Sequence, residues 1–270
     1  MSTHPILLRG GGDLASGVAL RLRHAGLNIV IAELPRPLAV RRTVSFAEAV
    51  YAGEITVEDV TARRAGSAAE AFSLARDGIV AVLVDPQAAI LDEEPFAALV
   101  DARLTKQAPD TTLSAAPLTV GLGPGFVAGE NVHAVVETQR GHTLGRVYWQ
   151  GSASADSGRP EGDPRRVLRA PAQGMLIAYA QIGEHVGEGQ TIAEIEPGDH
   201  GPRSTVHSPF QGVLRGLIHP GIEVSTGMKI GDVDPRDNPA YCLLVSDKAL
   251  AIGGGVLEAI MSHQDKNRNP

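Results

Sequence analysis

An internal repeat in the second half of the chain constrains its fold more than any other feature. The segment 170–195 matches the segment 208–233 when it is moved forward by 38 positions, and the alignment needs no gap. The matched pairs are Pro171 and Pro209, Gln173 and Gln211, Gly174 and Gly212, Leu176 and Leu214, Gly183 and Gly221, Val186 and Val224, Gly189 and Gly227, and Ile192 and Ile230. Each copy has short β-type runs around glycine turns and is too small to bury an apolar face alone. The two copies are therefore expected to form one doubled all-β module over 165–233.

The repeat resembles biotinyl and lipoyl carrier domains, in which two such copies form a barrel-sandwich fold. In those carriers the modified lysine lies at the hairpin between the copies. Here the corresponding stretch is Glu196-Pro197-Gly198-Asp199-His200, which contains no lysine. The resemblance implies a barrel-sandwich (biotinyl/lipoyl-like) module, and the missing lysine predicts that it carries no biotin or lipoate.

The first 150 residues have the alternating pattern of an α/β domain. An apolar run at 5–9 leads into a glycine turn and a helix, and a second apolar run follows at 27–32, which makes a βαβ unit. The unbroken apolar run at 79–84 is typical of a parallel strand buried on both faces. For residues 1–150 we predict a Rossmann-like nucleotide-binding domain with a parallel sheet. Two helices, at 45–51 and 67–76, are expected to begin with the N-caps Ser45 and Ser67.

Residues rich in Ser, Gly, Asp and Pro at 152–164 predict a linker to the β module. After that module, residues 234–270 are expected to return to the Rossmann-like domain, as a strand at 241–245 and a helix at 256–261 with a three-glycine interruption between them. The predicted fold class is therefore α/β, with a Rossmann-like parallel sheet and an inserted all-β module.

The turn after the first strand has the spacing of a phosphate-binding fingerprint. Gly10, Gly12 and Ala15 match the pattern G-x-G-x-x-A, and the acidic Glu33 follows about 20 residues later. Glycines allow a tight turn and a close approach to a phosphate, and a helix N-terminus offers free N–H groups to an anion. Glu33 would accept a hydrogen bond from a ribose hydroxyl. The predicted cofactor site also includes Gly11, Asp13 and Gly17, with Arg41 and Arg42 as further phosphate ligands.

The alternative interpretation of this turn is structural, with the glycines forming a tight corner and Asp13 capping the helix. A second glycine loop, with Gly121, Gly123 and Gly125, follows the predicted strand at 118–120. It is expected either to face the first turn across the sheet, as a second part of the cofactor site, or to be a structural corner.

Composition excludes several classes of function. The net charge is −7 and the sequence pI is about 5.7, so a nucleic-acid partner is not expected. The single cysteine, Cys242, allows no internal disulfide and suits a reducing cytoplasm. We expect no membrane segment, because no apolar run approaches about 20 residues. The nine histidines show no paired metal-ligand spacing, so no metal site is predicted.

Several stretches together resemble the YqeB-type proteins associated with selenium-dependent molybdenum hydroxylases. They are residues 9–17, 41–51, 121–129, 136–138, 140–142, 144–146, 234–236 and 246–260. The last of these, Ser246-Asp247-Lys248-Ala249 with the glycines that follow, is also similar to accessory factors of the XdhC type. The resemblance implies a maturation protein that holds a molybdopterin-type dinucleotide or another nucleotide for a molybdenum hydroxylase client.

Two other functions stay open at this point, an NAD(P)-dependent oxidoreductase and a non-enzymatic client-docking module. The sequence leaves open whether the chain is an enzyme and whether it forms a homo-oligomer. Six further polar residues are expected to line the ligand-binding cleft of the first domain: Asp101, Arg103, Lys106, Glu137, His142 and Arg146.

Overall fold

The computed structural model describes all residues except 1–3, 105–108, 157–161, 199–200 and 269–270. The chain divides into two compact units. Unit 1 contains Met1–Pro37, Ser45–Ser157 and Val245–Pro270, and unit 2 contains Leu38–Val44 and Gly158–Leu244.

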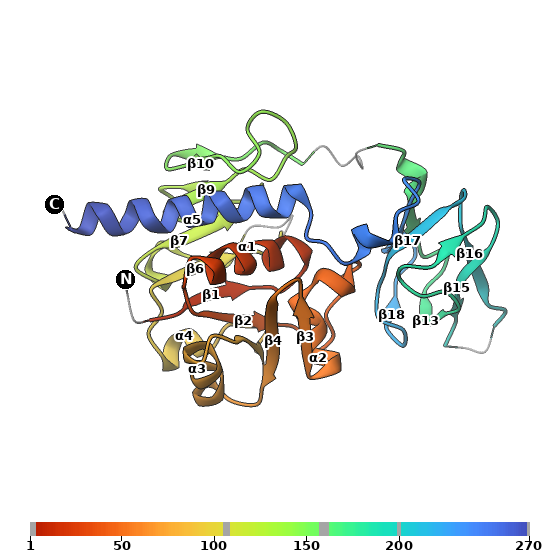
Figure 1. Cartoon of the computed structure of the whole chain (residues 1–270), viewed down its shortest axis with the longest axis horizontal. Helices are drawn as coiled ribbons and strands as arrows, with labels where there is room; N and C mark the ends of the chain where they lie inside the picture. The colour runs from red at the N-terminus through yellow and green to blue at the C-terminus, as the bar shows by residue number, and fades with distance from the viewer. Residues whose placement is uncertain (1–3, 105–108, 157–161, 199–200, 269–270) are drawn as a thin grey trace. The chain divides into compact units, whose positions relative to one another are not determined.

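Unit 1 is built on a nine-stranded sheet with the order β10-β9-β7-β6-β1-β2-β5-β4-β3 (Figure 1). The parallel strands are β1 (Ile6–Arg9), β2 (Ile29–Glu33), β4 (Val60–Ala65), β5 (Val80–Val84), β6 (Ala98–Asp101), β7 (Thr119–Leu122) and β9 (Ala134–Val136). The antiparallel edge strands are β3 (Glu54–Val57) and β10 (Val147–Tyr148). A small second sheet pairs β8 (Val127–Ala128) with β11 (Gly151–Ser152).

The central strands are buried on both faces, as their apolar sequences require. Every residue of β1, β2 and β6 is buried, which is typical of strands covered by helices on both sides. The helices are α1 (Asp13–His24), α2 (Ala49–Ala52), α3 (Ala68–Arg76), α4 (Ile90–Glu93) and α5 (Asp247–Arg268), with short 3₁₀ turns η2 (Phe46–Glu48) and η3 (Leu113–Ala115). Helices α1 and α5 lie side by side (Figure 1), and α3 packs against β4 and β5.

The Rossmann-like parallel sheet predicted for the first domain is corrected by this topology. The sheet is mixed, because the hairpin of β3 and β4 closes one edge and β10 pairs antiparallel with β9 at the other. The sequence analysis missed that hairpin. Its two strands are separated only by Glu58 and Asp59, and Glu58 has a positive φ of 55° that the pattern did not reveal.

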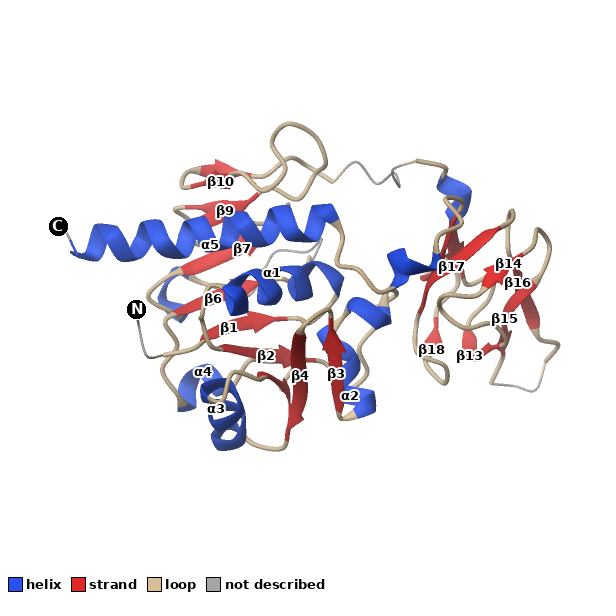
Figure 2. Cartoon of the chain, viewed as in Figure 1, coloured by secondary structure: helices blue, strands red, loops and turns tan. Residues whose placement is uncertain are grey.

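The long regular elements of unit 2 are strands, in two four-stranded antiparallel sheets (Figure 2). One sheet has the order β12-β19-β17-β14 and the other β16-β15-β13-β18. The strands are β12 (Val167–Arg169), β13 (Gly174–Ala178), β14 (His185–Val186), β15 (Thr191–Glu196), β16 (Ser204–His207), β17 (Gly212–Leu217), β18 (Glu223–Val224) and β19 (Lys229–Asp234). Three 3₁₀ turns, η1 (Arg42–Val44), η4 (Pro164–Arg166) and η5 (Pro239–Cys242), complete the unit.

The 38-residue repeat recurs in these strands. Strand β13 corresponds to β17, β14 to β18 and β15 to β19, each displaced by 38 positions along the chain. In each sheet the two inner strands come from one copy and the two outer strands lie outside that copy, β14 pairing with β17 and β18 with β13. The predicted Rossmann domain with a barrel-sandwich insert is therefore replaced by a mixed sheet and two separate antiparallel sheets.

Local predictions near the C-terminus and around Ser45 also need correction. The strand predicted at 241–245 is instead the turn η5 followed by irregular chain, and α5 runs from Asp247 straight through the three glycines. Ser45 makes no side-chain cap, and only short 3₁₀ and helical turns follow it. Ser67, by contrast, accepts a hydrogen bond from the Glu70 amide and caps α3 as predicted.

Candidate functional site

The glycine turn of unit 1 lies where the strand order changes direction. From β1 the chain passes through α1 to β2 and then to β5 on one side of β1, whereas β6, β7 and β9 lie on the other side. Open α/β sheets bind ligands outside the carboxyl ends of the strands at such a switch point. The turn 10–12 directly follows β1 at this position, beside the end of β6.

The three glycines of the turn have different surroundings. Gly10 has a φ of +93°, a region that favours glycine. A Cβ on Gly11 would lie 3.0 Å from the backbone nitrogen of Ala47, so the packing behind the turn leaves little room for a side chain. A Cβ on Gly12 would meet nothing within 4 Å. The open side of the turn is therefore at Gly12.

Helix α1 begins at Asp13 with Gly12 as its N-cap residue, and no side chain caps it. The N–H groups of a first helical turn have no partner within the helix and attract anions. Ala15 is buried in the first turn, as the fingerprint requires for close packing. Gly17 has another role, since a Cβ there would lie 2.5 Å from the Cβ of Ala249 on α5.

Glu33, the last residue of β2, closes the inner side of the turn. Its Oε2 accepts a hydrogen bond from the Gly11 amide at 2.6 Å, and its Oε1 accepts one from the Leu34 amide at 2.7 Å. Burial raises the pKa of this carboxyl, and the two amide hydrogen bonds partly offset that rise. The structure thus brings Glu33 and the glycine turn together, and one of the turn's amides is already bonded to a side chain.

A cluster of charged residues surrounds the ends of β1 and β6. The buried Arg9 donates to both oxygens of Asp110, at 2.9 and 3.1 Å. Arg103 donates from Nε to Asp101 at 2.9 Å and from Nη2 to both Asp101 and Asp110. Thr111 donates to Asp101 at 2.6 Å. These bonds join the two arginines and the two aspartates in one network.

Sequence reasoning identified Asp101 and Arg103 of this cluster but missed Arg9, Asp110 and Thr111. An arginine that ends an otherwise apolar strand was the signal available for Arg9, because a buried charge needs a partner of opposite sign. Asp110 and Thr111 lie in an irregular segment whose position no periodic pattern predicts. Lys106, also predicted for the cleft, lies outside the described residues.

The second glycine loop follows β7 and is closely packed by its own neighbours. A Cβ on Gly121 would collide with the ring of Phe126, and one on Gly123 would lie 2.6 Å from Oγ1 of Thr138. Gly125 is exposed, with a φ of +100°. Close packing therefore explains why Gly121 and Gly123 are glycines. The part of this loop in a cofactor site stays a prediction.

Glu137 is completely buried after β9 and accepts hydrogen bonds from the amides of Gln139 and Ser154, both at 2.8 Å. Burial by itself would raise its pKa, but the hydrogen bonds to the carboxylate lower it. The carboxylate therefore organises the loops beyond β9. His142 and Arg146 lie on the surface of the same segment.

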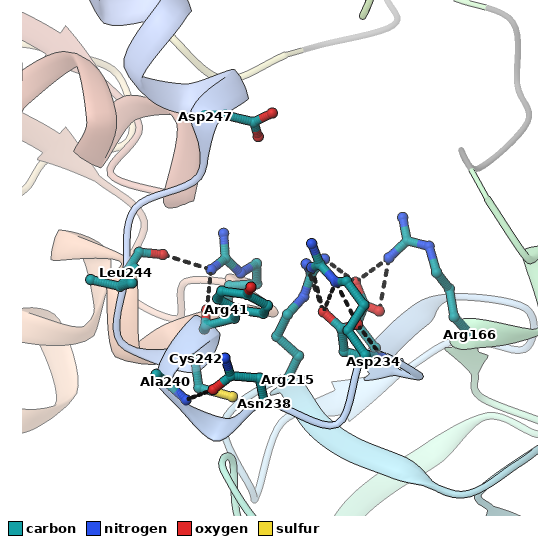
Figure 3. A network of polar contacts seen from close by, with 12 residues as sticks. Arg41, Arg166, Arg215, Asp234, Asn238, Ala240, Cys242, Leu244 and Asp247 are labelled. Atoms are coloured by element: carbon teal, nitrogen blue, oxygen red, sulfur yellow. Dashed lines mark hydrogen bonds and ion pairs between the residues drawn. The ribbon is translucent and has the colours of Figure 1, made fainter.

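Arg41 and Arg42 belong to unit 2, where backbone carbonyls bind their guanidinium groups. Arg41 donates to the carbonyl oxygens of Tyr241 at 3.0 Å and Leu244 at 2.9 Å (Figure 3). Arg42 donates from Nε to the carbonyl of Leu217 at 2.8 Å. Arg41 therefore stabilises the chain around η5 and Arg42 the end of β17, and their predicted role as phosphate ligands stays untested.

Within the described part of the chain, no group of three or more His, Cys, Asp or Glu residues could hold a metal ion. Cys242 is buried, and burial raises the pKa of its thiol.

One helical stretch, Pro239–Gln264, is long and apolar enough to cross a membrane by length and composition, with a mean hydropathy of 1.4. The expectation that the chain has no membrane segment stays a prediction. A core helix of a globular protein meets the same criterion, and α5 packs against α1. A cytoplasmic location stays a prediction.

Comparison with known proteins finds a similar sequence whose name does not state a function. The chain is 49% identical over 260 residues to the uncharacterized protein YqeB of Escherichia coli K12, which covers 95% of this chain. The chain spans about half, 47%, of the length of that protein. No family model matches the chain.

Similar solved structures come from another group of proteins. The ectoine utilization protein EutE (DoeB) of Ruegeria pomeroyi has 15% identity and a TM-score of 0.29, and covers 85% of this chain and 86% of its own. A succinylglutamate desuccinylase/aspartoacylase of Rhodobacter sphaeroides has 15% identity and a TM-score of 0.30, with 86% of each chain covered. An aspartoacylase family protein of Mesorhizobium loti has 12% identity and a TM-score of 0.29, with 85% of each chain covered.

These comparisons correct the function predicted from the sequence. The similar structures are named as an ectoine utilization protein, an aspartoacylase family protein and a succinylglutamate desuccinylase/aspartoacylase, not as molybdenum-cofactor maturation proteins or NAD(P)-dependent oxidoreductases. Both predicted functions are withdrawn, the docking alternative stays a prediction, and the name of the E. coli protein supports none of them. At these TM-scores the likeness transfers no hydrolase activity to this chain. The finding that stands is a sequence similarity to YqeB of E. coli over nearly all of this chain.

Proposed function

We propose that unit 1 binds a phosphate-bearing nucleotide at the turn between β1 and α1. The observation that carries the proposal is the open side of Gly12, directly in front of the first turn of α1. The N-terminus of a helix attracts a phosphate through its free N–H groups and its dipole. The position of the turn at the switch point of the sheet supports the same ligand.

Glu33 supplies the second element of the proposed site. Its two oxygens each accept one amide hydrogen bond, and a carboxylate has further acceptor sites beyond these two. A ribose hydroxyl of the nucleotide would donate to one of them. Asp13, in the first helical turn, adds a negative charge that weakens the attraction for phosphate, so a moderate affinity is expected.

The experiment is a calorimetric titration of the purified chain with ADP, GDP and CDP. Gly12→Val fills the open side of the turn, where an added side chain meets nothing within 4 Å. The matched control is Gly254→Val, at an equally open position on α5. The proposal expects binding of at least one of the three nucleotides, an affinity at least about tenfold lower in Gly12→Val, and no change in the control. Binding of none of the three, or equal affinity in Gly12→Val, would overturn it.

A further inference from the structure

We infer that Arg9 and Arg103 form an anion subsite beside the glycine turn, and that Asp110 occupies it as an internal carboxylate which the phosphate of a ligand displaces. The inference rests on the proposed function, because it assigns a second phosphate contact to the same ligand. It adds residues that the glycine fingerprint does not contain.

The geometry of Asp110 is that of a bound oxyanion. Arg9 holds its two oxygens through Nη1 at 2.9 Å and Nη2 at 3.1 Å, and Nη2 of Arg103 bonds the first of them. A two-point contact of this kind is how arginine recognises carboxylate and phosphate alike. A phosphate oxygen pair would therefore find the same donors if Asp110 left.

Burial distinguishes the members of the cluster. The side chain of Arg9 is only 6% exposed, whereas that of Asp110 is 58% exposed. Among the described residues, the Arg9 side chain donates hydrogen bonds to Asp110 and to the neutral hydroxyl of Thr111. A buried guanidinium is costly without an opposite charge. Asp110 can move into solvent, and Arg9 then requires another anion.

The fully buried Asp101 has other hydrogen-bond partners among the described residues. It is already engaged by Arg103 through Nε and Nη2, and it accepts a hydrogen bond from Thr111. With Asp110 in place the two arginines face two aspartates, and without it the cluster carries one excess positive charge. The hydrogen bonds from Arg103 and Arg9 also hold the pKa of Asp110 far below its usual range, so it is anionic whenever it is bound.

The subsite adjoins the turn. A Cβ on Gly10 would lie 3.5 Å from both the Cα and the Cγ of Arg103, so this arginine passes the first residue of the turn at van der Waals distance. One phosphate chain can therefore contact the helix N-terminus and the arginine pair together. Asp110 would act as a competitor that lowers the apparent affinity for that ligand.

The test measures ADP and inorganic pyrophosphate binding by calorimetry in the full chain and in Asp110→Ala, with Asp110→Asn as the milder variant if the first unfolds. The expected result is about tenfold tighter binding in either variant. Adding Arg103→Gln to Asp110→Ala should remove that gain. The control is Asp163→Asn, which breaks an exposed ion pair with Arg165 in unit 2 and should leave the affinity unchanged.

Unchanged or weaker binding in both Asp110 variants, with ADP still bound by the original chain, would overturn the inference and leave the proposed function standing. Pyrophosphate binding to Asp110→Ala that is lost with Arg103→Gln but unaffected by Gly12→Val would support the arginine subsite and count against the turn. Failure of every variant to bind ADP and pyrophosphate would overturn the inference, and the proposed function falls with it if GDP and CDP also fail to bind.

Discussion

The Cβ of Ala249 lies where a side chain at Gly17 would have to be, since a Cβ added to Gly17 would come within 2.5 Å of it. Gly253, one turn further along α5, lies as close to the other helix, where its added Cβ would be 2.6 Å from the carbonyl oxygen of Gly17. The glycines that the sequence assigned to phosphate binding and to a helix break thus let α1 and α5 approach each other.

Replacing Gly17 should therefore destabilise unit 1. The change Gly17→Ala forces the two helices apart, and overpacking of this kind costs about 1–3 kcal/mol. The matched change Gly254→Ala, at an open position on α5, should be neutral or stabilising because alanine favours helix. Urea denaturation followed by circular dichroism measures both, and a Gly17→Ala chain as stable as the original would show that the helices are not held at this contact.

In unit 2, two glycines that correspond in the repeat should be equally indispensable. A Cβ on Gly174 would collide with the carbonyl oxygen of Glu196, and one on Gly212 would lie 2.5 Å from that of Asp234. Gly174→Ala and Gly212→Ala should each lower the free energy of unfolding by about 2 kcal/mol.

The control for these two changes is Gly187→Ala, where an added Cβ meets nothing within 4 Å. Thermal melting of the three variants distinguishes the outcomes. If only one of the two repeat glycines proved sensitive, the structural equivalence of the copies at this position would be refuted.

Glu33 should make stability depend on pH in an unusual direction. Because burial raises the pKa of Glu33 above its value in the unfolded chain, its protonated form is favoured in the folded state. The contribution of Glu33 to the free energy of unfolding is fully present below the pKa that it has in the unfolded chain. It is lost as the pH rises through the pKa that it has in the folded chain. The stability advantage of the original chain over Glu33→Gln should therefore shrink from pH 4 towards pH 7. Urea titrations at several pH values test this, and an advantage that grows with pH would contradict it.

Asp234 should show the opposite dependence. Burial alone would raise its pKa, but hydrogen bonds from Arg236 and the charge of Arg215 lower it to about 2. Its contribution to stability is thus present above the unfolded pKa and is lost as the pH falls through about 2. Asp234→Asn should cost about 2 kcal/mol at pH 7, the usual worth of a hydrogen bond to a charged group.

For Asp234 the matched control is Asp237→Asn, which alters an exposed pair with His185 and should cost little. Acid titration of the unfolding midpoint compares the two variants. Equal losses of stability in both variants would show that the contacts of the buried Asp234 with Arg215 and Arg236 stabilise the fold no more than an exposed pair does.

The sequence predicted the elements that depend on local apolar pattern. Strands β1 and β5 lie where the unbroken apolar runs placed them, and the 38-residue offset of the repeat reappears in β13 and β17. The edge hairpin of β3 and β4 was missed because a half-exposed strand carries a weak pattern. The three glycines of α5 were taken for a break, although tertiary packing against α1 and the Gly145 loop holds them in a helix.

The candidate site was predictable only in its local part. Gly11 and Glu33 are connected by one βαβ unit, so their proximity follows from the chain itself. The bonds from Arg9 to Asp110 join residues 101 positions apart, and no spacing rule reaches across such a distance. Arg41 and Arg42 lie in unit 2, which the chain enters at Leu38, and their predicted part in the site stays a prediction.

In unit 2 each copy of the repeat supplies an outer strand to the sheet of the other copy, and this pairing determines when the unit can fold. Val167 of β12 pairs with Asp232 of β19, so the sheet that holds both closes only after the whole intervening chain has been synthesised. Such distant pairings form slowly, because loop-closure entropy must be overcome first. On a translating ribosome β13 would pair with β15 within the first copy but would keep an unpaired edge until β18 of the second copy emerged. Premature termination between the copies would leave that edge exposed and prone to aggregate.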